Sequence, residues 1–212
     1  GRERRVFERH VELLVGAGVP EEAAREAVAP KMGALRLHGQ ARNYEQVPMA
    51  AQRLGMPFLN IHCPLDEKGR RVMQAAVDGV LRDDARATIS DLVRALAGLP
   101  AAARAETDVT VPLGKLSSPA GKTVVAHGAL TNGGYHVARA YFEHGVDTVV
   151  YIHVSSQDVR RLSQDVDGQL IVTGHLVGDA FGIEPYIDAL RRRGLRVDVL
   201  SQVLSAASGL HE

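Results

Sequence analysis

Apolar, strand-like runs alternate with helix-like runs through the second half of this chain of 212 residues. The predicted strands cover 107–111, 122–127, 147–153, 170–173 and 195–200, and the predicted helices cover 135–144, 155–164 and 181–193. Parallel strands joined by helices require right-handed crossovers, which place the carboxyl ends of neighbouring strands on one edge of a sheet. The pattern therefore predicts an α/β fold of layered sheets with flanking helices and a β-α-β-α-β second half.

The first half is mostly helical in pattern. Predicted helices cover 4–15, 20–28, 43–54, 69–82 and a further segment that begins at Thr88. Asn43 is expected to cap the third of these helices, and Asp91 lies at the capping-box spacing from Thr88. The run Pro57–Ile61 is expected to form a strand.

One short segment is the best candidate for a linker. It is the Ala-rich run 97–104, which also contains a Gly and a Pro. We expect an N-terminal α/β part over 1–98 and a C-terminal α/β part over 99–212. The chain starts at Gly1 rather than at Met and enters a charged helical pattern at once. We therefore expect that further residues precede it.

The pattern His-x-x-x-Asp occurs twice, in each case after a strand-like run and before a helix-like stretch, a junction where α/β proteins place chemistry. An imidazole and a carboxylate from each copy could hold one or two metal ions, because His and Asp suit Zn, Fe, Mn or Ni and a carboxylate can bridge two cations. We interpret four residues as ligands of a divalent transition metal: His62, Asp66, His175 and Asp179. We expect both motifs to lie at one end of the molecule.

These residues also have structural interpretations. Asp is a favoured N-cap, so Asp66 and Asp179 could each act only as the cap of a helix. The occurrence of two His-x-x-x-Asp motifs at equivalent places favours the metal site. Cys63, the single cysteine, is expected to be a small packed residue rather than a soft ligand. Glu67 is a candidate general base or hydrogen-bond acceptor for a ligand, or simply an exposed residue that favours the helix dipole.

Three other features have weaker functional interpretations. The Gly-rich run 128–134 joins a strand to a helix N-terminus, which suits an anion. It lacks the Lys and Ser/Thr of a P-loop and the spacing of a dinucleotide motif, so we assign no organic cofactor there. His127 and His153 are expected at strand ends on the same edge, where they could line a substrate cavity or be satisfied by the backbone.

Composition excludes several classes of partner. Lys plus Arg equals Asp plus Glu at 25 each, so no overall field attracts nucleic acid or an anionic membrane. A single cysteine excludes a disulfide framework, and the sequence has neither a bilayer-spanning apolar run nor a signal-peptide pattern. We therefore expect a cytoplasmic protein with no nucleic-acid and no membrane partner.

Several segments resemble one known family. Asn60–Asp66 is similar to the His-x-x-x-Asp signature of the dinuclear-metal proteins called Nif-three-like, often labelled GTP cyclohydrolase I type two. Gly174–Gly182 resembles the C-terminal Gly-His motif of that family, and Val124–Ser156 resembles the stretch between the two motifs. The resemblance covers most of residues 43–201.

The resemblance implies two divalent ions held by the four residues named above, with Asp66 as the bridging ligand. Two features depart from the family pattern. The adjacent His-His pair of the family is absent, and neither His10 nor His38 is assigned in its place. Asp179 stands where many relatives have Glu, whose side chain is one methylene longer.

The expected activity follows from the metal site. A divalent ion that acidifies water beside a carboxylate base can hydrolyse phosphate esters or open a purine-like ring. We expect a metal-dependent hydrolase whose small-molecule substrate is a nucleotide or a phosphate ester; the alternative is a non-catalytic metal-binding scaffold or regulatory protein. By resemblance we also expect a ring-like homo-oligomer with two-fold or three-fold symmetry and with Asp179 facing its interior.

Overall fold

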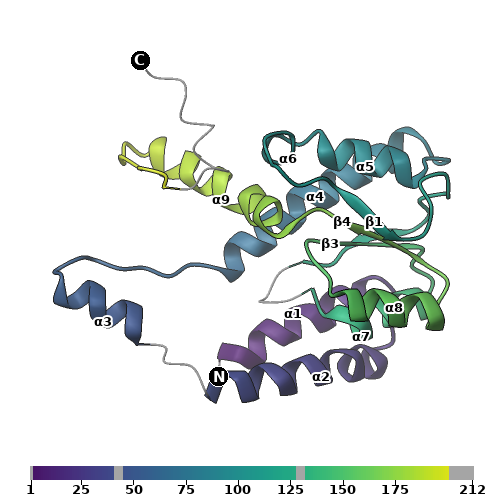
Figure 1. Ribbon diagram of the computed structural model, residues 1–212, viewed down its shortest axis with the longest axis horizontal. Helices are drawn as coiled ribbons and strands as arrows, with labels where there is room; N and C mark the ends of the chain where they lie inside the picture. The colour runs from purple at the N-terminus through teal and green to yellow at the C-terminus, as the bar shows by residue number, and fades with distance from the viewer. Residues whose placement is uncertain (1, 41–44, 128–131, 201–212) are drawn as a thin grey trace.

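The structure is a computed structural model and describes residues 2–40, 45–127 and 132–200. Within these residues a mixed sheet of four strands lies between two layers of helices (Figure 1). In spatial order the strands are β1 (Thr110–Leu113), β4 (Gln169–Val172), β3 (Thr148–Tyr151) and β2 (Thr123–Val125). The predicted α/β fold with flanking helices is confirmed.

Helices α7 (Gly134–Glu143) and α8 (Ser156–Asp165) connect the parallel strands β2, β3 and β4. Thr123 pairs with Thr148, and Thr148 pairs in turn with Gln169. The predicted β-α-β-α-β order is thus confirmed over this part of the chain, while β1 joins the edge of the sheet antiparallel to β4. The parallel order brings the carboxyl ends of β2, β3 and β4 to one edge.

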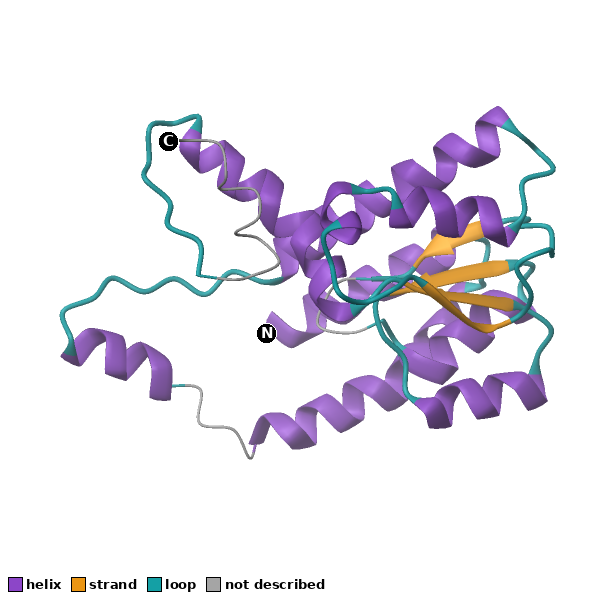
Figure 2. Cartoon of the chain, turned by 45° about the horizontal axis from the view of Figure 1, so that its top comes forward, coloured by secondary structure: helices purple, strands orange, loops and turns teal. Residues whose placement is uncertain are grey.

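Side chains alternate between the two faces of the sheet. Val149 and Tyr151 are buried in the core under α7 and α8, whereas Val150 and Ile152 are buried in the core on the opposite face. Figure 2 shows the strands side by side with helices above and below them. Because both faces are covered, the parallel strands are continuous apolar runs.

Further helices complete both layers. On the α7 side, α1 (Arg2–Gly16) and α2 (Glu21–Gln40) pack on α7, and α1 buries Phe7, Val11 and Leu14 at helical spacing. The opposite face is covered by α4 (Cys63–Asp83), α5 (Ile89–Ala97), α6 (Pro100–Ala103) and α9 (His175–Arg191). Among the described residues, no helix is both long and apolar enough to cross a membrane.

The segment between α4 and β1 is folded against the rest of the protein. Helix α5 starts as predicted, because the Asp91 carboxylate accepts hydrogen bonds from the Thr88 amide at 2.9 Å and from the Thr88 hydroxyl at 2.7 Å. The predicted linker 97–104 contains α6, whose Ala101 is buried in the second core. The division of the chain into two parts at this point stays a prediction.

One segment stands outside the layers (Figure 1). It consists of α3 (Gln46–Arg53) and the extended residues that lead to α4, and we call residues 46–61 the arm. No residue of α3 is buried. Large apolar side chains are exposed along the arm, namely Val47, Met49, Leu54, Met56, Phe58, Leu59 and Ile61.

Two strand predictions are wrong. Residues Pro57–Ile61 are extended but pair with no other strand in the described chain, and residues 195–200 follow α9 as irregular backbone. A strand needs a neighbour for its N–H and C=O groups, and an apolar pattern cannot supply that neighbour. The predicted cap Asn43 and residues 128–131 of the Gly-rich run lie outside the described residues.

Side chains limit further strand pairing at both edges of the sheet. At the β2 edge, the Gln74 amide donates a hydrogen bond to the Thr123 carbonyl at 3.4 Å, and its oxygen accepts one from the Val125 amide at 2.9 Å. At the β1 edge, Pro112 has no N–H group to donate. These residues mark where the sheet ends.

Candidate metal centre

Two helices begin at the edge of the sheet where the parallel strands end. Helix α4 begins at Cys63, directly after His62, and Pro64 in its first turn favours this start. Helix α9 begins at His175 after Gly174, whose φ of 98° turns the chain out of β4. Both helices begin earlier than predicted, so each His-x-x-x-Asp motif lies at the start of a helix.

A spacing of four residues places the His and the Asp of each motif on one face of its helix. His62 Nδ1 lies 3.5 Å from Asp66 Oδ2, and His175 Nε2 lies 3.7 Å from Asp179 Oδ2. Asp66 is only 3% exposed, whereas both histidines are exposed. The carboxylates are therefore deeper in the site than the imidazoles.

Glycines allow α4 and α9 to cross almost backbone to backbone. A Cβ added at Gly69 would lie 2.7 Å from the Gly178 carbonyl oxygen, and one added at Gly182 would lie even closer to the Leu65 backbone. A larger side chain has no room at these positions. The close crossing brings the first turns of both helices together.

One donor atom from each of His62, Asp66 and Asp179 lies within 4.8 Å of the other two, and we call these residues the His-Asp cluster. The Oδ1 atom of Asp179 is buried and has no hydrogen-bond partner. An unpaired buried carboxylate oxygen is unfavourable, and a cation would satisfy it. His175 lies outside the cluster but beside Asp179. The residues fit a metal ion, and three donors leave coordination positions open.

The Glu67 side chain ties α1 to α4. It accepts hydrogen bonds, each at 2.9 Å, from the guanidinium groups of Arg70, Arg9 and Arg71. Burial alone would raise the pKa of Glu67, but these hydrogen bonds lower it to about 2. A general base needs a pKa near the operating pH. The contacts therefore favour an ion-pair anchor over the predicted base.

Cys63 is half-buried beside the cluster. Burial, and then the charge of Asp66, raise the pKa of its thiol. A thiol must lose its proton to bind a metal ion. The environment of Cys63 thus favours packing over ligation, in line with the expectation from the sequence.

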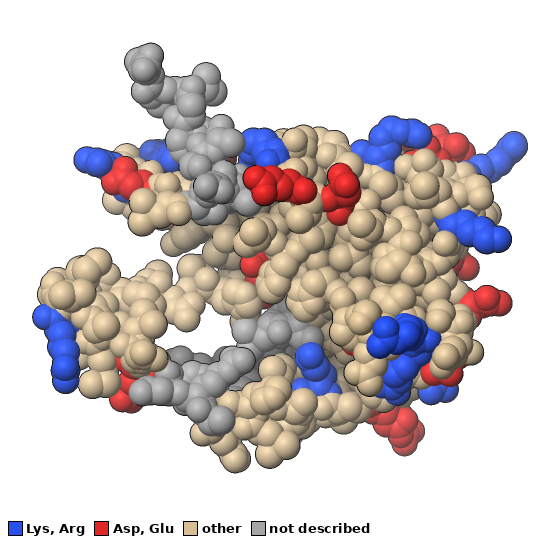
Figure 3. Space-filling view, in the orientation of Figure 1, with Lys and Arg blue, Asp and Glu red and all other residues tan. Residues whose placement is uncertain are grey.

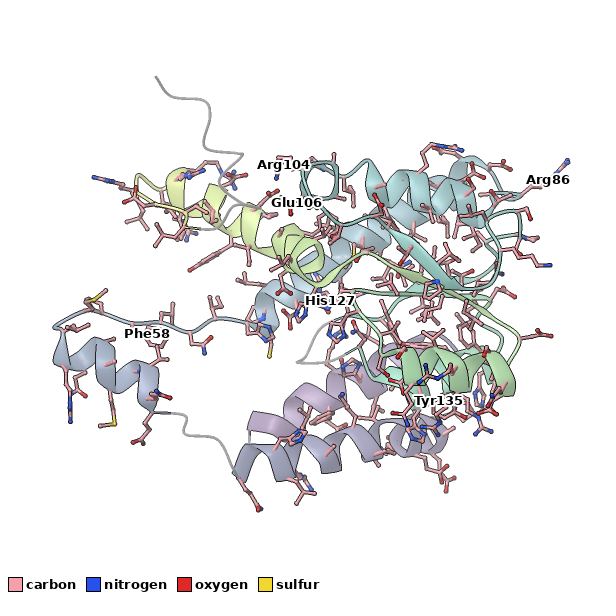
Figure 4. The ribbon with its side chains drawn as sticks, viewed as in Figure 1. Phe58, Arg86, Arg104, Glu106, His127 and Tyr135 are labelled. Atoms are coloured by element: carbon pink, nitrogen blue, oxygen red, sulfur yellow. The ribbon has the colours of Figure 1, made fainter. Side chains whose placement is uncertain are left out.

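Two further histidines lie at the same edge of the sheet. His127 and His153 each lie two residues beyond the ends of β2 and β3, and Figure 4 shows His127 near the first turn of α4. The ring centroids of His153 and His175 are 4.7 Å apart. Burial, and then the imidazoles of His175 and His62, lower the pKa of His127 to about 3. The His127 ring is therefore neutral at neutral pH.

No family model matches the chain, and no curated protein matches it. It is similar to a NIF3 superfamily protein from Sphaerobacter thermophilus, whose crystal structure aligns with a TM-score of 0.88 and a sequence identity of 46%. The alignment covers 92% of this chain and 71% of that chain. The similarity extends to sequence as well as to fold.

Proposed function

The chain belongs to the NIF3 superfamily, and on this premise we propose that it is a metal-dependent hydrolase whose ions bind between the first turns of α4 and α9. The observation that carries the proposal is the approach of three donors, from His62, Asp66 and Asp179, within 4.8 Å. The buried, unpartnered Oδ1 of Asp179 supports it. His175, beside Asp179, completes the proposed set of four ligands, which two ions share.

The donors suit Zn, Fe, Mn or Ni, since these ions bind imidazole nitrogen and carboxylate oxygen. A bound divalent ion supplies Lewis acidity, which polarises a phosphoryl oxygen and lowers the pKa of water toward neutrality. Asp66, the most buried donor, is the proposed bridge between two ions. The exposed rings of His62 and His175 leave a small molecule with access from solvent. We propose nucleotides or phosphate esters as substrates.

The open geometry favours an enzyme over a metal-binding scaffold. Structural metal sites are closed by four protein ligands, whereas catalytic sites keep a position for water or substrate. Three donors gather in the His-Asp cluster, and the side chain of His62 is 49% exposed. Solvent therefore reaches the metal side of the cluster.

We expect the protein to retain a divalent transition metal after dialysis, and Asp66→Ala or His62→Ala to remove it. Each variant removes one of the three donor atoms that lie within 4.8 Å of one another. Elemental analysis of the full chain measures the metal, and circular dichroism checks the fold. Asp83→Ala is the matched control, because it makes the same change at an exposed position of α4.

His62 is exposed, so His62→Ala keeps the test valid even where loss of the buried Asp66 disturbs folding. Wild-type metal content in both variants would contradict the ligand assignment. A screen of nucleotides and phosphate esters then tests turnover. Metal binding without hydrolysis of any of them would contradict the hydrolase and support the scaffold.

We also propose a homo-oligomer of two-fold or three-fold symmetry in which the arm packs against a second copy of the chain. The arm exposes Leu54 at 73% and Leu59 at 74%. Monomeric soluble proteins rarely expose contiguous apolar patches of this kind. Figure 3 shows a mostly uncharged surface on the visible face of the arm, with a blue basic group on its left side. A copy of the same chain offers a matching apolar surface.

We expect light scattering to give an oligomeric mass for the full chain, and the double variant Leu54→Glu, Leu59→Glu to give a monomer of 22.8 kDa. Two carboxylates would have to be desolvated in the apolar contact. Leu116→Glu is the control, because it changes a leucine that is 54% exposed outside the arm. A wild-type monomer over a wide concentration range would refute the assembly.

A further inference from the structure

Lys31 is a cation on the packing face of α2. That face buries Ala24, Ala27 and Val28. A period of 3.6 residues per turn places Lys31 on the same face, between Val28 and the partly buried Leu35. Lys31 is nevertheless exposed, and it forms no ion pair with another residue that the structure describes. Lysine is rare on a packing face unless its charge has a partner, so Lys31 is a candidate for binding an anion.

Helix α2 carries Lys31 to the edge of the sheet where the parallel strands end. The helix begins beside the start of β2, where the Lys122 ammonium donates a hydrogen bond to the Ala17 carbonyl. It packs on α7 and runs along the sheet toward the first turns of α4 and α9 (Figure 1). Residues 21–31 rise about 15 Å as a helix, and residues 122–127 span about 16 Å as a strand. Lys31 is therefore level with the edge that carries the His-Asp cluster.

His153 lies at the same edge, next to the proposed ligand His175. Their ring centroids are 4.7 Å apart, and the rings are tilted by 35°. The His153 carbonyl accepts a hydrogen bond from the buried Asn132 amide at 2.9 Å, which fixes its backbone. Burial, then the imidazole of His175 and then the charge of Lys31 lower the pKa of His153, whereas the Asp179 carboxylate raises it. His153 is therefore influenced both by the cation of α2 and by the metal centre.

We propose that Lys31 and His153 bind the phosphate group of the substrate beside the metal ions. The inference rests on the proposed function, because it assumes that ions occupy the metal centre. An ammonium group binds phosphate as a point charge, and an imidazole donates an N–H group in either charge state. The carboxylates of Asp66 and Asp179 repel an anion until bound cations offset their charge. Phosphate should therefore bind only to the metal-loaded protein.

This arrangement favours a phosphate monoester, or the terminal phosphate of a nucleotide, over a phosphodiester. A phosphate monoester carries a charge of roughly −1.5 to −2 at pH 7 and offers three acceptor oxygens. One oxygen can face the ions while another accepts a hydrogen bond from Lys31. A diester carries a single charge, which the ions alone would offset. Lys31 should therefore contribute more to the binding of a monoester.

The test titrates the zinc-loaded full chain with inorganic phosphate in a calorimeter. We expect Lys31→Met to weaken phosphate binding at least about 10-fold, which is the contribution of a hydrogen bond to a charged group, and to keep the zinc content of the wild type. Lys31→Arg should keep most of the affinity, because a guanidinium group also binds phosphate. Lys115→Met is the matched control, because it makes the same change at an exposed lysine beside the starts of β3 and β4, at the opposite edge of the sheet.

A second measurement compares the hydrolysis of para-nitrophenyl phosphate with that of the corresponding diester. We expect the ratio of kcat/KM for the monoester to kcat/KM for the diester to fall in Lys31→Met and in His153→Ala. His153→Gln keeps an N–H group and should recover part of the ratio. His153 is exposed, so its variants remain informative even where a change in α2 disturbs folding.

Wild-type affinity for phosphate in Lys31→Met would overturn the inference and leave the proposed function intact. So would a zinc-loaded wild type that binds no phosphate, or metal-free protein that binds it equally well. Phosphate binding that depends on Lys31, without hydrolysis of any phosphate ester, would contradict the hydrolase alone. A wild type without metal would overturn both proposals.

Discussion

Replacing Gly182 with Ala is expected to cost roughly 3 kcal/mol or more of the free energy of unfolding. The new Cβ would overlap the Leu65 backbone and lie 3.2 Å from the Gly69 nitrogen. Both contacts are with the backbone of α4, so relief requires the two helices to separate rather than one side chain to rotate. Because native domains have only about 5–15 kcal/mol of stability, the loss is large. Urea denaturation measures it.

Gly79→Ala is the matched control. Gly79 also lies in α4, but a Cβ added there meets no atom within 4 Å. Alanine should therefore stabilise that helix by about 0.5–1 kcal/mol. Folded Gly182→Ala protein should also bind metal weakly, since separation of the helices moves Asp66 away from Asp179. Equal urea midpoints for Gly182→Ala and wild type would refute the close crossing.

Asn132→Ala is expected to destabilise the protein by roughly 2 kcal/mol or more. The Asn132 amide donates to the His153 carbonyl at 2.9 Å, and its oxygen accepts from the Ile152 amide at 3.3 Å. Asn132 and Ile152 are 2% and 3% exposed, so the deletion leaves a buried N–H group unpaired. Thermal and urea denaturation measure the change.

Asn60→Ala makes the same change at an exposed position and should shift stability by no more than about 0.5 kcal/mol. Asn132 also fixes the backbone of His153, whose ring centroid lies 4.7 Å from that of the proposed ligand His175, so its loss should weaken metal binding. Similar stabilities for the two alanine variants would show that the hydrogen bonds of Asn132 contribute little.

The sequence predicts the centre of the fold well because each signal there is local. Strands β2 to β4 are apolar runs separated by amphipathic helices, and the capping-box spacing of Thr88 and Asp91 locates α5. The repeated His-x-x-x-Asp motif predicts that these residues act together, whereas their place on the first turns of α4 and α9 is seen only in the structure. These features depend on neighbours in the chain rather than on the whole fold.

The other features of the fold and of the site depend on contacts between residues that are far apart in the sequence. The strand expected at Pro57–Ile61 has the right composition but no neighbour to pair with in the described chain. Glycine usually weakens a helix, so Gly69 and Gly182 give no sign in sequence that they mark a helix crossing. The burial of His127 near His62, His153 and His175 depends on segments that meet only in the fold. For this reason the sequence left its role open.

The residues at the two edges of the sheet affect how this protein can aggregate. An open edge strand is a template on which other chains add strands, which is the route to fibrils. The Gln74 amide occupies two backbone groups of β2 that an added strand would need, and Pro112 removes a donor from β1. At high concentration, copies of the chain are therefore hindered from forming fibrils by adding strands to this sheet. They can still associate through side-chain surfaces, which a closed assembly of finite size can bury completely.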